Sequence, residues 1–266
     1  MVNTGMDEQV LKAMRQLRQR EAIGLKQGQT VPFTGADVWN GYEISWLNRW
    51  GKPQIALLRW VVPCQSVYSF NPAVLQAYFN GLAMQRLDSS DALKELLTDD
   101  LSRVADCRVS VDLIEHDAFE QEELCTEFDG TSLDRLFVEL DQYEGADASL
   151  LKKDSEQQPH TEVLTSNLLR VSDPATGAAL WASVRVAYTG APIEHAGLLR
   201  YLVSYRMERM EAETCIERIY MDVLRACQPQ RLFVYARFTR RHGMDVNPLR
   251  CSAPQALPPM QRLVRQ

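Results

Sequence analysis

Ser155, His160 and Glu162 lie in one short segment and carry side chains that can do chemistry. A serine hydroxyl becomes a nucleophile only beside a general base, and a histidine five residues away can supply one. Glu162 adds a carboxylate that can act as a general acid or base. The segment therefore predicts candidate catalytic residues, although a serine and a histidine at this spacing are also a common accident.

Two other groups of reactive side chains, the cysteines and a basic run, are weaker evidence for a functional site. The six cysteines form no C-x-x-C pair and the chain has only four histidines, so we expect no metal site and reduced, mostly buried thiols. A basic run near the C-terminus predicts either an anion pocket or a structural contact of a dimer. It comprises Arg237, Arg240, Arg241 and Arg250, with His242 in a turn. Both interpretations of this basic run stay open.

Composition narrows the class of ligand. The formal net charge is -6 and the pI is near 5.4, which argues against a surface that binds nucleic acid, because such binding depends on clustered Lys and Arg. No apolar run approaches the ~20 residues of a membrane span, and the first residues lack the apolar centre of a signal peptide. We therefore expect a cytoplasmic protein with a small-molecule ligand, without membrane or nucleic-acid partners.

The elements that must position these residues follow one order twice. Residues 35–47 and 54–63 predict two strands joined by a turn, 72–104 predict two helices with a break near 88–91, and 108–114 predict a strand. The same order returns downstream, with a strand at 162–171, a strand at 179–188, helices within 193–227 and a strand at 231–238. The acidic, irregular residues 121–153 connect the two parts.

This repeat predicts the fold class. Residues 75–111 align without a gap on 198–234, with identical pairs such as Leu75 and Leu198 or Tyr78 and Tyr201. Two β-β-α-α-β units indicate an α+β protein with antiparallel sheets that carry helices on one face. The expected division is an N-terminal helical extension (1–29), an N-terminal domain (30–150) and a C-terminal domain (151–266). Because such sheets have open edges, we expect closure with another copy into a barrel.

Long strings of the sequence resemble one enzyme family. VPFTGADVWNGYEISWLN near the start, LLRYLVSYRMERMEAETCIERIYMDVLRACQP, YARFTRRHGMDVNP and the closing RLVRQ are similar to the long, two-domain form of the NADPH-dependent 7-cyano-7-deazaguanine (nitrile) reductases. The similarity runs from about Thr30 to Gln266. It implies tandem tunnelling-fold (T-fold) domains that assemble into a barrel-like homodimer and bind planar purine- or pterin-like ligands between units.

The resemblance also implies catalytic residues, and here the chain departs from the family. In these reductases a cysteine attacks the nitrile carbon to give a thioimide, which NADPH reduces in two hydride steps. We expect Ser155 in the place of that cysteine and Glu162 in the place of the family's acid–base aspartate. A hydroxyl has a far higher pKa than a thiol, so the exchange predicts loss of the covalent step.

The residues expected to bind the substrate and the cofactor match the family only in part. The family's His-Glu pair aligns with Ala212-Glu213. In the family, this glutamate accepts hydrogen bonds from the ring N–H and the amino group of the deazaguanine. Its lysine-bearing motif, Glu-Ser-Lys-Ser-x-Lys, falls on residues 71–76, where Asn71 replaces the glutamate and both lysines are absent. The resemblance thus predicts Glu213 and Asn71 as substrate-binding residues and leaves the cofactor, NADPH in the family, unknown. Without the resemblance, Glu213 would be interpreted as a solvated helix residue.

Three hypotheses follow. The preferred one is a diverged homologue that binds a planar nitrogen heterocycle without the thioimide reduction and is repurposed for other chemistry, with Glu162, Ser155 and His160 as the candidate catalytic residues. The first alternative is an authentic NADPH-dependent 7-cyano-7-deazaguanine reductase of queuosine biosynthesis. The second alternative is a non-catalytic binding or partner subunit.

Overall fold

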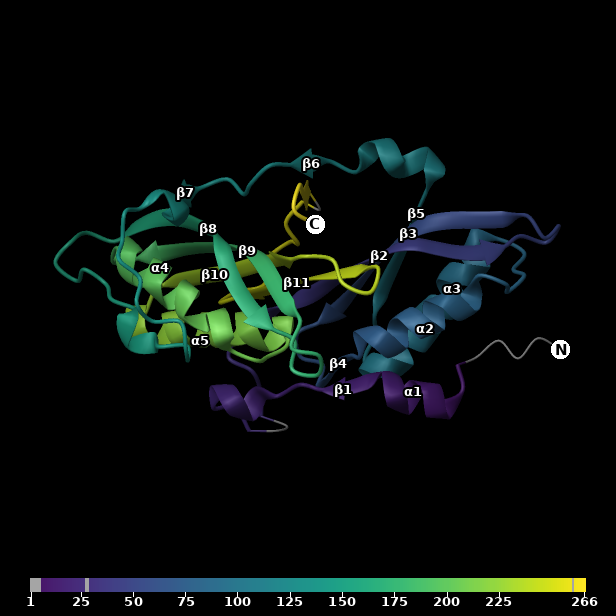
Figure 1. Ribbon diagram of the computed structural model, residues 1–266, viewed down its shortest axis with the longest axis horizontal. Helices are drawn as coiled ribbons and strands as arrows, with labels where there is room; N and C mark the ends of the chain where they lie inside the picture. Colours follow the sequence, from purple (N-terminus) through teal and green to yellow (C-terminus); the bar gives the residue numbers. More distant parts are fainter. Residues whose placement is uncertain (1–5, 27–28, 260) are drawn as a thin grey trace.

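One eight-stranded sheet runs through the molecule. In the computed structural model, which describes residues 6–26, 29–259 and 261–266, the strand order is β5-β3-β2-β11-β10-β9-β8-β7. Figure 1 shows the long helices on one face of this sheet, and the connection through β6 together with the C-terminal segment on the other face. The mixed α+β class with helices on one face is as predicted.

Two units with the same element order build the sheet. The first comprises β2 (Thr34–Leu47), β3 (Pro53–Pro63), α2 (Pro72–Leu82), α3 (Ser90–Ala105) and β5 (Ser110–Glu115). The second comprises β8 (His160–Ser172), β9 (Ala179–Gly190), α4 (His195–Ser204), α5 (Ala212–Cys227) and β10 (Arg231–Phe238). The order of these elements is the predicted β-β-α-α-β in both units, and the first unit has one additional short strand, β4 (Tyr68–Phe70), between β3 and α2.

The two units also share local detail. α3 and α5 both have 16 residues, and each ends at a left-handed residue, Asp106 (φ 53°) and Gln228 (φ 50°). The hairpins β2–β3 and β8–β9 each contain one register shift. The starts of α2 and α4 match the predicted offset between the repeats, whereas α3 and α5 differ from it by one residue.

β11 (Met244–Cys251) is a strand that the repeat does not predict. It pairs with β10 on one side and with β2 on the other, both antiparallel, so it joins the units into one sheet. Three short strands lie outside the repeated units: β6 (Leu124–Cys125), β7 (Thr131–Ser132) and β12 (Arg262–Leu263). The chain between the units also has 3-10 turns at His116–Gln121, Leu133–Arg135 and Ala148–Leu150, and another turn, Tyr205–Met207, lies between α4 and α5. Residues 121–153 are otherwise irregular, as expected.

Each unit has its own apolar core beneath the sheet. In the first, Trp39 and Trp60 stack at 5.5 Å between ring centroids, and the edge of Phe70 packs against both. In the second, α4 and α5 cover the inner faces of β8, β9 and β10. The alternation of buried and exposed residues along β3 is the pattern of a strand with one face in such a core.

The N-terminal segment is only partly helical. α1 (Glu8–Met14) is followed directly by β1 (Arg15–Leu17), which pairs antiparallel with β4 (Tyr68–Phe70), and by a 3-10 turn at Arg20–Ile23. The expected helical extension thus contains one short helix, and the strand that follows it lies against the first unit. Figure 1 shows this segment running beneath both units. Over the residues the structure describes, no helix is long and apolar enough to cross a membrane.

Candidate functional site

Both units contribute to a cleft at the N-terminal ends of α2 and α5. Its walls are largely apolar and include a few charged groups. The lining residues are Trp39, Pro72, Leu180, Glu211, Ala212, Glu213, Phe238, Thr239, Arg241, Met244 and Val246. Apolar walls with a few convergent polar groups are typical of a small-molecule site.

Glu213 lies in the first turn of α5, and its residue is only 4% exposed, so it is not the solvated helix residue that the local sequence indicates. The Ser69 hydroxyl, from β4, donates a hydrogen bond to Oε1 of Glu213. Burial raises the pKa of Glu213, and Asp37 raises it further, while Arg18 and Ser69 oppose the shift. The carboxylate thus sits at the cleft with few partners of its own.

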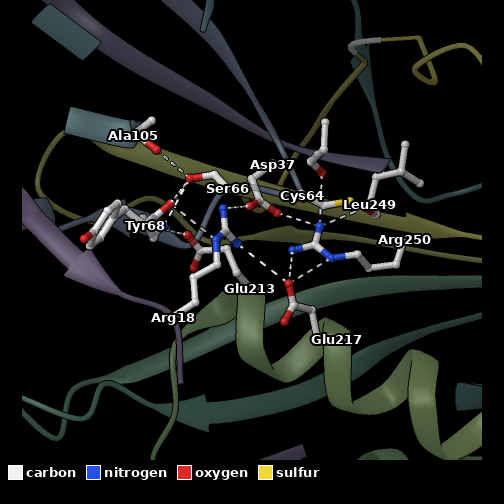
Figure 2. Close-up of polar contacts among 12 residues, drawn as sticks. Arg18, Asp37, Cys64, Ser66, Tyr68, Ala105, Glu213, Glu217, Leu249 and Arg250 are labelled. Atoms are coloured by element: carbon white, nitrogen blue, oxygen red, sulfur yellow. Dashed lines mark hydrogen bonds and ion pairs between the residues drawn. The ribbon is translucent and has the colours of Figure 1, made fainter. Parts of the chain in front are cut away.

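A network of buried charges surrounds Glu213 (Figure 2). Arg18 lies 2.5 Å from Asp37 and 3.8 Å from Glu217, measured between nitrogen and carboxylate oxygen. Arg250 reaches the same two carboxylates at 2.7 and 2.8 Å. Burial acts to raise the pKa values of Asp37 and Glu217, but the arginines hold both below the ordinary range. These charges join the N-terminal segment, β2, β11 and α5 behind the cleft.

Asn71 lies beside the cleft as the residue that caps α2. Its side-chain oxygen accepts hydrogen bonds from the backbone N–H groups of Ala73 (3.1 Å) and Val74 (3.4 Å), and Pro72, the next residue, forms part of the cleft wall. The oxygen is therefore engaged in the cap, and the side-chain amino group is the part left for a ligand. A binding role for Asn71 stays a prediction.

Glu162 and His160 meet in a different cluster. Oε2 of Glu162 accepts a hydrogen bond from the Tyr188 hydroxyl (2.6 Å) and lies 3.5 Å from Nε2 of His160, while its Oε1 lies 3.0 Å from Nε2 of His195. Ser155 is exposed in the loop before β8, and within the described chain no hydrogen bond joins it to His160 or Glu162.

This cluster is far from Glu213. Glu162 is near the start of β8, whereas the end of β8 contacts the segment before α5, where Ser172 exchanges backbone hydrogen bonds with Glu208 (2.7 Å) and Met210 (3.0 Å). Ten strand residues at roughly 3.3 Å each separate the two ends by about 33 Å. The structure therefore does not bring Ser155, His160 or Glu162 to a ligand held by Glu213.

The sequence did not lead us to predict that residues at the cleft end of the β8–β9 hairpin belong to the site. Asp173 is 3% exposed; its Oδ1 accepts from the backbone N–H and the hydroxyl of Thr176, both at 2.6 Å, and its Oδ2 pairs with Arg241 at 2.7 Å. Leu180, the second residue of β9, lines the cleft. The turn string DPATG was the available signal, because Asp, Pro and Gly mark the point where the hairpin reverses.

The basic run is divided among separate contacts. Arg250 belongs to the buried network, Arg241 pairs with Asp173, and Arg240 lies over the ring of Tyr42 at 3.5 Å. No group of three or more metal-ligating side chains occurs among the residues described. All six cysteines are free thiols, four of them buried.

Comparisons with known proteins agree along the chain. The family model described as nitrile reductase, 7-cyano-7-deazaguanine-reductase N-term, matches residues 3–113, and the one described as QueF-like protein matches residues 180–256. An NADPH-dependent 7-cyano-7-deazaguanine reductase of Cupriavidus necator is 41% identical over 263 residues, 99% of this chain and 94% of the relative. Proteins of the same name from Burkholderia vietnamiensis and Burkholderia lata are 42% and 44% identical over 247 residues, 93% of this chain and 89% of each relative.

These relatives overturn the preferred hypothesis of a homologue repurposed for other chemistry. That hypothesis relied on single positions, among them Ser155, which lies far from Glu213. Identity of 41–44% to proteins named as authentic reductases, over nearly all of the chain, favours the first alternative. The chain belongs to the family of NADPH-dependent 7-cyano-7-deazaguanine (nitrile) reductases.

Proposed function

We propose that this chain is an NADPH-dependent 7-cyano-7-deazaguanine reductase whose substrate binds in the cleft against Glu213. The names of the relatives support the reaction. The buried carboxylate of Glu213, at the wall of a largely apolar cleft, is the observation that supports this binding site.

The cleft is suited to the edge of a guanine-like ring. A carboxylate can accept two parallel N–H donors, here the ring N–H and the exocyclic amino group, in a charge-assisted contact. Trp39, which lines the cleft, contributes an apolar ring surface to its wall.

The residues of the cleft do not fit the phosphates of NADPH. Arg241 is the one cation among the described lining residues, and it is already paired with Asp173. The first turn of α2 carries no basic residue. We therefore assign no residue to the dinucleotide and derive no step through it.

The overall reaction consumes two hydrides and two protons for each nitrile that becomes an aminomethyl group. The thioimide that the resemblance implies needs a thiol, and no cysteine lies among the described residues that line the cleft. The proposal thus concerns the substrate, its contact with Glu213 and the net reduction, and it leaves the covalent step unassigned.

The wider family properties are part of the same proposal. We infer tandem T-fold domains, with bounds 30–150 and 151–266 after the N-terminal segment, closed into a barrel by a second copy of the chain. Among the residues that the structure describes, β5 pairs with β3 alone, and its open edge supports this pairing. The ligand is a small heterocycle, and a cytoplasmic location is expected.

Absorbance of the nicotinamide during incubation with 7-cyano-7-deazaguanine and NADPH tests the reaction, and calorimetry tests binding. We expect two NADPH oxidised per nitrile, and about 10- to 100-fold weaker binding in Glu213→Gln, because a charged acceptor is lost. Glu194→Gln is the matched control, since Glu194 is exposed and lies just before α4 as Glu213 lies at the start of α5.

Two results would contradict the proposal. Binding of the nitrile without NADPH oxidation would show a binding protein and not a reductase. Unchanged affinity in Glu213→Gln would remove that residue from the site.

A further inference from the structure

Another cavity lies on the face of the sheet opposite the long helices, where the connection through β6 and the C-terminal segment cross the strands (Figure 1). Its lining residues come from β2, β3, β5 and β10, from residues 122–124 and from β12. Its volume is about 150 Å³, below the roughly 300–1,000 Å³ of pockets that hold drug-sized ligands. The cavity therefore suits a small ion and is too small for a nucleotide.

Arg237, on β10, is a buried arginine without a carboxylate partner. Its residue is 2% exposed, and it forms no ion pair within residues 6–26, 29–259 and 261–266. Its Nη1 donates a hydrogen bond to the carbonyl oxygen of Gln261, and its Nε is buried without a hydrogen-bond partner among the described residues. The other buried arginines, Arg18, Arg20 and Arg250, each pair with a carboxylate. Because a buried charge without a counter-charge is unfavourable, Arg237 calls for an anion in the cavity that it lines.

Two glutamates also line the cavity, and both have other partners. Glu122 pairs with Arg59 at 2.8 Å, and Oε2 of Glu123 accepts a hydrogen bond of 2.8 Å from a glutamine side chain. With Arg59, Arg237 and Arg262, the described lining residues carry three cations against these two carboxylates. The cavity thus has an excess of positive charge.

Asp245, on the neighbouring strand β11, has partners of its own as well. Its carboxylate accepts hydrogen bonds from the side chains of Asn40 (2.8 Å), Tyr42 (2.6 Å) and Asn247 (2.5 Å), which are all uncharged donors. In the part of the chain that the structure describes, Asp245 forms no ion pair, so it does not serve as the counter-charge of Arg237.

We propose that this cavity binds a small tetrahedral oxyanion, inorganic phosphate, between Arg237 of the sheet and Arg262 of the C-terminal segment. Nε of Arg262 donates to the backbone oxygen of Gln266 (3.1 Å), so its two Nη groups are left for a ligand. A guanidinium group holds phosphate through parallel N–H donors in charge-assisted hydrogen bonds. The described lining residues of this cavity and of the Glu213 cleft are different, so the inference goes beyond the proposed reduction and does not depend on it.

The anion joins the C-terminal segment to the sheet. Arg262 lies in β12 next to Leu263, which is buried, and Nε2 of Gln266 donates to the carbonyl of Phe238 on β10 (2.9 Å). Without an anion, Arg237 and Arg262 repel each other, whereas a bound anion attracts both. Phosphate should therefore slow the removal of C-terminal residues by a carboxypeptidase.

Calorimetric titration of the full chain with phosphate at constant ionic strength tests the site. We expect one phosphate per chain in the wild type and about 10- to 100-fold weaker binding in Arg237→Met, because charge-assisted hydrogen bonds are lost. Arg262→Met should also weaken binding, and it should abolish the protection from carboxypeptidase by phosphate.

Arg231→Met is the matched control. Arg231 lies on the same strand as Arg237 but is exposed and outside the cavity, so this variant should bind phosphate as the wild type does. Arg237→Met removes an unpaired buried charge, so its Tm without phosphate should be at least that of the wild type. Phosphate should then raise the Tm of the wild type and of Arg231→Met more than that of Arg237→Met, since the general stabilising effect of phosphate is the same in all three chains.

Three results would overturn the proposal. A folded wild type that does not bind phosphate would show that water satisfies Arg237. Equal affinity in Arg237→Met would place the ion elsewhere, and equally weakened binding in Arg231→Met would show a general attraction to basic groups. Because neither Arg237 nor Arg262 lines the cleft, these results leave the proposed reduction untouched, and a lack of NADPH oxidation leaves the phosphate site untouched.

Discussion

Glu213 and Glu217 lie one turn apart on α5 and are both buried, yet their pKa values shift in opposite directions. Glu217 pairs with Arg20 and Arg250 at 2.7 and 2.8 Å, so the arginines overcome the effect of burial. Glu213 has the Ser69 hydroxyl as its side-chain hydrogen-bond partner, and there burial prevails. The difference leaves Glu213 with capacity for the donors of a ligand, whereas Glu217 serves the structure.

Removing one arginine of this network should destabilise the protein. Arg250→Met removes the arginine that bridges Asp37 and Glu217, so Asp37 keeps only Arg18 and Glu217 keeps Arg20 and Arg18, and removing one partner from a buried ion pair costs about 3–5 kcal/mol. Urea unfolding measures the change in the free energy of unfolding. Arg49→Met is the control, because Arg49 is exposed and only stacks on Trp50. An equal, small effect of both substitutions would show that the network does not contribute to stability.

Of the candidate site, the sequence predicted Glu213 but not the residues around it. Glu213 was found through the strings around it, and the structure places it at the cleft. Ser155 and Glu162 could not be placed, because their positions relative to Glu213 depend on which end of β8 meets the helix, and the spacing within one segment does not contain that information. Glu211 gave no signal, since its neighbour Gln16 is far away in the sequence.

Most elements could be predicted because period-two and helical patterns are local. Residues 231–238 coincide with β10, and β2, β3, β8 and β9 differ by one or two residues from the expected bounds. β11 was missed for a physical reason: it contains Asn247 and Pro248, and proline is rare in a strand that pairs on both sides because it cannot donate to the ladder.

The pairing of β11 with β2 makes a prediction about Gly35. Gly35 has φ 134°, and a Cβ there would lie 2.2 Å from the backbone oxygen of Leu249 on β11. We expect Gly35→Ala to lower the free energy of unfolding by about 3 kcal/mol or more, since both the conformation and the contact are unfavourable. Thermal and urea unfolding measure this change.

Gly81→Ala is the control for the same exchange. Gly81 lies within α2, and a Cβ there would meet nothing within 4 Å, so alanine should stabilise the helix by roughly 0.5–1 kcal/mol. If Gly35→Ala were as stable as the wild type, the close approach of β2 and β11 would be wrong.

At the scale of the whole molecule, the cleft exists only because the two units are joined. Trp39 and Pro72 come from the first unit, Leu180 and Glu213 from the second, and Gln16 and Arg18 reach the site from the N-terminal segment. No local pattern contains such a meeting of distant segments. The resemblance to a family supplied the role of Glu213, but packing determined its neighbours.

The hydrogen bonds of β3 show which backbone groups of β5 point toward the open edge of the sheet. Cys64 donates its backbone N–H to Gly35 (3.1 Å), so even-numbered residues of β3 bond to β2 and odd-numbered residues bond to β5. Arg59 therefore bonds with Asp112, its partner on β5. The backbone groups of Leu113, one residue on, point away from β3 toward the open edge.

If a second copy pairs with this edge, proline at position 113 should separate the copies. Leu113→Pro removes an outward N–H that β3 does not use, which an edge strand tolerates, so the chain should fold but sediment near 30.3 kDa instead of twice that mass. Leu113→Ala keeps the N–H and controls for the lost side chain, and it should remain a dimer. Asp112→Pro removes an inward N–H and should instead destabilise the fold. A Leu113→Pro chain that still sediments as a dimer would show that the copies meet elsewhere, because pairing through β5 needs that N–H.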